Sequence, residues 1–90
     1  MKTEYIETID GFLKNMPEGE LGDSIRVLMS VATGDHKYER KIGIGKAVGN
    51  VKKFRKSIKV GCSLDKALGK LVEVMDSRKN EHKPGTVKKG

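Results

Sequence analysis

Apolar residues recur along this chain at intervals of three and four positions, and strict alternation over the length of a strand is hard to find. Intervals of three and four place side chains on one face of an α-helix. The pattern therefore predicts an all-α fold, in which a small bundle of about four helices forms a single domain.

The first predicted helix covers residues 3–16, with acidic residues in its first turn. Its apolar face consists of Tyr5, Ile9, Phe12, Leu13 and Met16. The second covers residues 20–33 and is apolar on nearly every side, which is typical of a helix in the middle of a small domain. Its stripe consists of Leu21, Ile25, Leu28 and Ala32. Gly34 stands at the position of a C-terminal cap.

Residues 35–42 allow two interpretations, a short helix capped by Asp35 or a loop. The choice stays open because Gly43 and Gly45 follow, and each glycine weakens a continuous helix by roughly 1 kcal/mol relative to alanine. Whether residues 35–49 are helical is not decided by the sequence.

A third helix is expected over residues 44–60, either whole or starting later with Asn50 as its cap, and Gly61 closes it. A fourth helix follows a very short turn, with Ser63 as its N-cap, so the two helices should be neighbours. Its apolar stripe consists of Leu64, Leu68, Leu71 and Met75.

The chain divides into a helical domain, residues 1–79, and a C-terminal tail, residues 80–90. The tail is polar and basic and is broken by Pro84 and Gly85, so we expect it to be flexible. With 36% apolar residues and no tryptophan in 90 residues, the core must be aliphatic. A chain of this size has marginal stability, which a homodimer or other self-association would supplement.

Charge is distributed unevenly along the chain. Residues 1–35 have a net charge of −4 and residues 36–90 of +11, within a total of +7. No acidic residue occurs from position 40 to position 64, where eight residues are basic: Arg40, Lys41, Lys46, Lys52, Lys53, Arg55, Lys56 and Lys59. Such a dense basic surface repels itself, so it predicts a polyanionic partner that neutralises it. These eight residues are the candidate binding site.

On the third predicted helix, four lysines share the outward arc with Gly45 and Gly49, where bare backbone would let a phosphate approach closely. The lysines are Lys52, Lys53, Lys56 and Lys59. The competing interpretation is an ordinary solvated face, with glycines that mark a frayed N-terminus. Against it, exposed helix faces usually mix both signs, and this one contains no acid. Arg55 falls inside the apolar arc. It either lays its stem over the core edge or fixes a phosphate at the rim.

Residues 43–61, GIGKAVGNVKKFRKSIKVG, resemble the magainin family of membrane-active peptides in the GIGK opening and the KKF centre. The likeness covers about a fifth of the chain. It implies affinity for anionic bilayers, with Phe54 inserted and the lysines at the headgroups. Because the protein's own core needs the apolar face of this segment, we do not expect the folded protein to act on membranes.

Other motifs fit poorly. The glycines around Lys46 lack the ending of a phosphate-binding loop and the spacing of a dinucleotide fingerprint, and no predicted strand precedes them. A helix-turn-helix would place Lys70 where that motif usually has an apolar residue. Aromatic residues are nearly absent from the basic stretch, which argues against a platform for stacked bases. Contact with backbone phosphates is therefore favoured over the reading of bases.

No catalytic, cofactor or metal site is predicted. His36 and Glu39 lie three positions apart, but one such pair without further ligands is ordinary surface. Cys62 at a helix N-terminus has no histidine beside it in sequence. A single cysteine excludes an intrachain disulfide, and the acidic N-terminal segment does not resemble an export signal, so we expect a cytoplasmic protein.

The sequence therefore predicts a small, non-enzymatic, basic protein that binds nucleic-acid phosphates, of DNA or RNA, with low sequence specificity. The alternative is a protein-interaction module, a regulator or inhibitor that docks on an acidic surface of a larger partner. A third hypothesis is binding to a membrane surface through the cationic amphipathic helix. The sequence does not distinguish DNA from RNA or define the oligomeric state.

Overall fold

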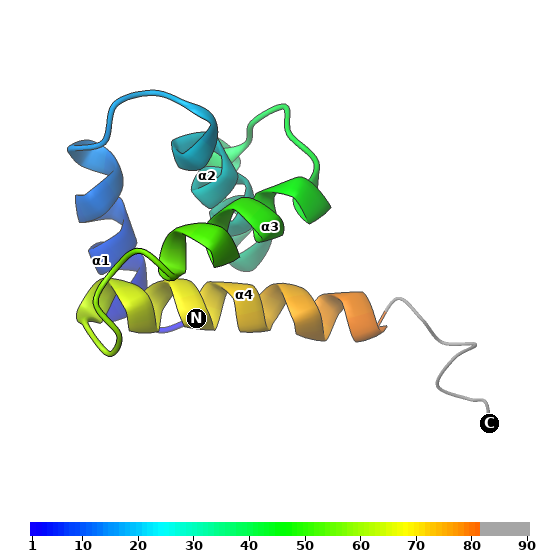
Figure 1. Cartoon of the computed structure of the whole chain (residues 1–90). Helices are drawn as coiled ribbons and strands as arrows, with labels where there is room; N and C mark the ends of the chain where they lie inside the picture. The colour runs from blue at the N-terminus through cyan, green and yellow to red at the C-terminus, as the bar shows by residue number, and fades with distance from the viewer. Residues whose placement is uncertain (82–90) are drawn as a thin grey trace.

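The computed structural model describes the backbone of residues 1–81 and the side chains of residues 1–77. Over this part of the chain it contains four α-helices, one turn of 3-10 helix and no strand, which confirms the all-α prediction. The elements are α1 (Thr3–Lys14), α2 (Glu20–Thr33), η1 (His36–Tyr38), α3 (Ile44–Arg55) and α4 (Ser63–Glu81) (Figure 1).

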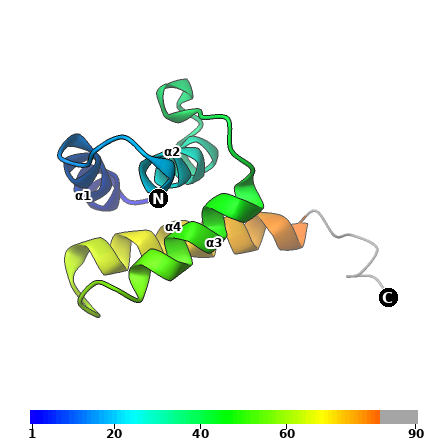
Figure 2. The ribbon, with the colours of Figure 1, turned by 45° about the horizontal axis from the view of Figure 1, so that its top comes forward.

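Helix α4 packs against each of the other three helices, and the most extensive pairing is that of α2 with α3. Figures 1 and 2 both show α3 and α4 side by side, joined by the turn of residues 56–62, while α1 lies against the N-terminal half of α4. Helix α2 is predicted at the centre of the core, and it contributes fully buried side chains there together with α4.

The core is mainly aliphatic, as the composition predicts. Ile25 and Leu28 of α2 and Leu68 and Leu71 of α4 have no exposed surface, and these four belong to the predicted apolar stripes. A side chain of this kind stabilises the fold by about 1.5–3 kcal/mol when it is fully buried. Helix α3 adds Ala47 and Val51, and helix α1 adds Ile9 and Leu13.

Two contacts join α1 to distant parts of the chain. The ring of Phe12 stacks on that of Phe54, with 5.6 Å between the ring centroids. The buried Tyr38 of η1 donates a hydrogen bond from its hydroxyl to Asp10 Oδ1 at 2.6 Å. Burial, and secondly this bond, raise the pKa of Tyr38 far above its ordinary value, so the phenol stays protonated. Helix α1 ends at Lys14, slightly earlier than predicted.

Helix α2 has the predicted bounds. Gly34 adopts the left-handed conformation of a C-cap, with φ of 77°, and its N–H donates to the carbonyl of Ser30. The sequence allows a short helix or a loop for residues 35–42, and in the structure this segment begins with a short helical turn. Asp35 Oδ1 accepts from the N–H of Lys37 at 3.0 Å and so caps the short helical turn η1.

Helix α3 begins at Ile44 as predicted but ends at Arg55, so the prediction that it continues to residue 60 is wrong. The hydroxyl of Ser57 donates to the carbonyl of Phe54 at 2.7 Å, which diverts that carbonyl from helix propagation. The chain then reverses through Gly61, whose φ is 85°. Asn50 is not a cap either, because it lies inside the helix.

The predicted N-cap of α4, Ser63, is already helical, and Cys62 is the residue that precedes the helix. The Cys62 carbonyl accepts the first helical hydrogen bond, from Lys66, and its Sγ accepts from the N–H of Asp65 at 3.4 Å. At its other end α4 continues through Glu81, beyond the division placed after residue 79. The rest of the predicted tail, residues 82–90, lies outside the described residues.

Candidate nucleic-acid interface

Four lysines of the predicted site gather where α3 ends. Lys52 and Lys53 occupy its last turn, Lys56 is its C-cap, and Lys59 follows in the turn to α4. All four side chains are exposed, and none forms an ion pair with the side chains that the structure describes. We call them the lysine cluster.

The helix terminus itself neutralises little of this charge. The C-terminus of an α-helix carries roughly half a negative charge, which stabilises nearby cations. This effect explains in part why lysines occur at the end of α3. The lysine cluster carries four positive charges. Most of its positive potential therefore faces solvent.

The two glycines predicted to share the lysine face are both helical. Gly45 and Gly49 lie in α3, and a Cβ added to either would meet no atom within 4 Å. Gly43 caps the helix, and its carbonyl accepts from the N–H of Ala47 at 2.9 Å, so the first turn is formed. The outward side of α3 is thus bare backbone and open space beside the lysines.

Three of the eight candidate residues are engaged within the chain. Arg40 Nε lies 3.4 Å from Asp23, and Lys46 Nζ lies 2.9 Å from Glu20. Arg55 pairs with Asp65 at 3.0 Å. All three carboxylates belong to α2 or α4, outside the acid-free stretch. The partners are far apart in sequence, so the spacing of charged residues does not predict these pairs.

Arg55 forms an internal ion pair that the two predicted alternatives do not include. Its Nε–H donates to Asp65 Oδ1, while Asp65 Oδ2 accepts from the N–H of Gly61. The guanidinium lies close against Gly69 of α4. The Gly61 bond, and then Arg55, lower the pKa of Asp65. Arg55 therefore holds α3 to the start of α4 and is not a free phosphate ligand.

Lys41 stands apart from the lysine cluster. It precedes the N-terminus of α3, and the cluster lies at the opposite end of this helix of about 18 Å. Its side chain is exposed and forms no ion pair with the described side chains. Of the eight predicted residues, four thus form the lysine cluster, three are paired within the chain and Lys41 stands apart.

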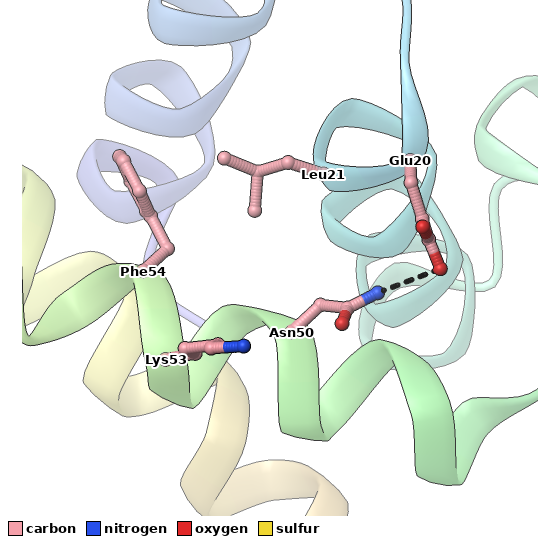
Figure 3. A pocket seen from close by; sticks show the side chains of 5 residues that line it. All are labelled: Glu20, Leu21, Asn50, Lys53 and Phe54. Atoms are coloured by element: carbon pink, nitrogen blue, oxygen red, sulfur yellow. Dashed lines mark hydrogen bonds between the residues drawn. The ribbon is translucent and has the colours of Figure 1, made fainter.

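A polar network that the sequence analysis missed joins α2 to α3. Asn50 Nδ2 donates to the buried Ser24 Oγ at 2.9 Å. It also donates to Glu20 Oε2 at 3.4 Å, the bond drawn in Figure 3. The hydrogen bond from Lys46, and then that from Asn50, lower the pKa of Glu20, so it is ionised at neutral pH. The only signal in the sequence was a serine within the apolar second helix.

A shallow hollow of about 310 Å³ opens beside this network, next to the lysine cluster. Figure 3 shows the five side chains around it: Glu20, Leu21, Asn50, Lys53 and Phe54. Those of Leu21 and Phe54 provide an apolar floor between the two helices, and the others provide a polar wall. Lys53 of the lysine cluster is among the residues that line it.

A second hollow, of about 510 Å³, lies between α2 and the segment leading into α3. Its lining residues are Val27, Ser30, Val31, Glu39, Arg40, Lys41, Ile42 and Ile44. Ile44 is 47% exposed, which is unusual for so large an apolar side chain in this fold. The hollow is therefore apolar at its base and basic on part of its rim.

The apolar face behind the resemblance to magainins is used inside the protein. Ala47 and Val51 are fully buried, and Phe54 stacks on Phe12. Across residues 1–81, no helix combines the length and the apolarity that a membrane crossing requires.

His36 and Glu39 do meet, with 3.1 Å between His36 Nδ1 and Glu39 Oε2, on an exposed surface. Within the described chain, however, no three His, Cys, Asp or Glu side chains are grouped closely enough to hold a metal ion. Comparison with protein-family models, with curated proteins and with solved structures finds no match to this chain.

Proposed function

We propose that this protein binds nucleic-acid phosphates, with low sequence preference, through the lysine cluster at the end of α3. The observation that carries the proposal is the set of four exposed lysines without a carboxylate partner in the described part of the chain. Of the eight basic residues in the acid-free stretch, three are paired internally and Lys41 lies apart, so the fold, and not composition alone, distinguishes the four of the lysine cluster.

The mechanism is counterion release. Each phosphate that a lysine neutralises frees condensed counterions into solution, and the entropy of that release drives binding. Lysine is a compact point charge without the planar geometry that reads a base edge, so such contacts position a strand but carry no sequence information.

A salt titration tests the proposal. Four neutralised phosphates give a slope of log affinity against log salt of about −3.6 on duplex DNA, and about −2.8 on a single strand. The slope is measured by fluorescence anisotropy with a labelled oligonucleotide, from low to moderate salt. An affinity that does not change with salt would exclude this mechanism.

A second candidate function is a protein-interaction module, which the apolar hollow near Ile44 favours. A partner with an apolar side chain flanked by carboxylates would fill the hollow and pair with Lys41 at its rim. A pull-down after nuclease treatment that returns one stoichiometric acidic protein, lost in Ile44→Asp, would support this candidate. The absence of any stoichiometric protein after nuclease treatment would exclude it.

We also propose that the protein self-associates and that it resides in a reducing compartment such as the cytoplasm. The exposed Ile44 supports the first, and the single, half-buried Cys62 supports the second. Sedimentation velocity over a hundredfold range of concentration tests self-association. A monomer at every concentration would exclude it.

A further inference from the structure

We infer that the hollow between α2 and α3 holds one unstacked base of a single-stranded nucleic acid, while Lys53 at its edge pairs with the adjoining phosphate. The inference rests on the proposed function, since it assigns a substrate class to the same surface. It adds two properties that phosphate binding alone does not have: preference for single strands, and preference for bases that carry an exocyclic amino group.

The floor of the hollow suits the face of a base. Leu21 and Phe54 are half-buried and line it from opposite helices. Phe54 is held in place by its stacking on Phe12, at 5.6 Å between centroids and 30° between ring planes. A fixed aromatic ring beside a lysine is the combination that single-strand binding surfaces use. The volume of about 310 Å³ lies at the lower end of the range for small-ligand sites.

The wall of the hollow offers hydrogen-bond acceptors. The amide nitrogen of Asn50 already donates to Ser24 and Glu20, which turns its Oδ1 away from both partners. Asn50 Oδ1 forms no hydrogen bond with the described residues, and Glu20 presents an ionised carboxylate beside it. Lys46 fixes that carboxylate at 2.9 Å and offsets its repulsion of a phosphate.

This wall selects among bases. Adenine, cytosine and guanine carry amino groups that donate to such acceptors, whereas thymine presents a carbonyl at the position of the cytosine amino group. In a duplex those groups are paired and the bases are stacked, so the hollow stays empty there. The scarcity of aromatic residues in the basic stretch favours phosphates over bases, but the fold adds a wall from α2 that the basic stretch does not contain.

The first experiment compares oligo(dC) with oligo(dT), two pyrimidine strands of equal length and charge. At neutral pH and fixed salt, we expect wild-type protein to bind oligo(dC) about three- to tenfold more tightly, the effect of one added hydrogen bond. Leu21→Phe, which fills the hollow without changing charge, should remove this preference and leave the affinity for inorganic polyphosphate unchanged.

The second experiment places a fluorophore in the hollow. The chain has no tryptophan, so Phe54→Trp provides a single emitter in the floor of the hollow, and Phe12→Trp provides a matched emitter behind it. Oligo(dC) should quench the first more strongly than the second. Polyphosphate, which has no base, should quench neither.

The outcomes separate the two proposals. Salt-dependent binding of polyphosphate and of both oligonucleotides with equal affinity, in wild type and Leu21→Phe alike, would overturn the base site and leave phosphate binding intact. Binding of none of these polyanions would overturn the proposed function together with the inference. The comparison of oligo(dC) with oligo(dT) uses wild-type protein, so it tests the base site even if a tryptophan variant does not fold.

Discussion

At the scale of single residues, two helical glycines differ in what a methyl group would meet. In Gly49→Ala the new Cβ points into open space, whereas in Gly69→Ala it would lie 3.0–3.3 Å from the Arg55 guanidinium. We expect Gly49→Ala to stabilise the protein by about 0.5–1 kcal/mol, because alanine loses less entropy in a helix. Gly69→Ala should gain less or lose stability.

Urea denaturation of both variants checks this difference. A larger gain in Gly69→Ala than in Gly49→Ala would contradict the position of Arg55 over α4. Gly49→Ala also has a functional use, since a stabilised variant that binds nucleic acid less well would show that a phosphate approaches the bare backbone of α3.

Asp65 makes the stability of the folded protein depend on pH. Its pKa is lowered in the folded state by the Gly61 N–H and by Arg55. The stability it contributes is therefore present above the pKa of an unfolded aspartate, about 4, and is lost as pH falls through the folded value. Asp65→Asn should be less stable at neutral pH and lose less stability than wild type between about pH 5 and pH 2.

Thermal unfolding over this pH range measures the difference, with Asp76→Asn as the control. Asp76 is exposed on the same helix and forms no ion pair among the described side chains. If the stability of Asp65→Asn falls with decreasing pH as steeply as that of wild type, the role assigned to Asp65 is contradicted.

At the scale of the elements, local chemistry is enough to predict α2. Its apolar pattern, the glycine at position 34 with positive φ and the capping carboxylate of Asp35 act within a few residues of one another. Predictions from sequence succeed where the deciding contacts are local. The aliphatic stripes of α2 and α4 are of the same kind, because periodicity alone identifies them.

The end of α3 depends on contacts that periodicity does not contain. Ser57 competes for a helix carbonyl, and Asp65 of the next helix accepts the N–H of Gly61 and pairs with Arg55. The apolar pattern continues to Ile58 and Val60, which is why the sequence predicts a longer helix. In the fold Val60 is 87% exposed in the turn.

The docking of α2 on α3 yields a third prediction. Asn50→Ala removes the donor to the buried Ser24 and to Glu20, so we expect a loss of about 1–2 kcal/mol in the free energy of unfolding. Asn15→Ala is the matched control. Its side chain donates only to a carbonyl of its own exposed helix end, and its loss should stay within about 0.5 kcal/mol. Equal losses would contradict the network.

At the scale of the whole molecule, the charge asymmetry is visible in the sequence, but its distribution over the surface is not. The acid-free stretch suggests eight equivalent cations. Folding pairs Arg40, Lys46 and Arg55 with carboxylates of α2 and α4 and leaves a cluster of four at one end of α3. The partner class stays a prediction from the sequence, whereas the grouping of the four lysines and the hollow beside them depend on which helices meet.

The most direct test compares two variants of identical net charge. Lys52→Gln with Lys56→Gln removes two members of the lysine cluster, and Lys2→Gln with Lys14→Gln removes two exposed lysines around α1. Each double variant lowers the formal net charge of +7 by two, so general electrostatic attraction falls equally.

Affinity for one labelled oligonucleotide is measured for both variants across a salt series. If the lysine cluster holds the phosphates, the α3 variant loses roughly tenfold to a hundredfold in affinity at moderate salt, and its salt slope becomes shallower by about 1.8 on duplex DNA. The α1 variant keeps a slope close to that of wild type. Equal losses in the two variants would contradict a phosphate site at the end of α3.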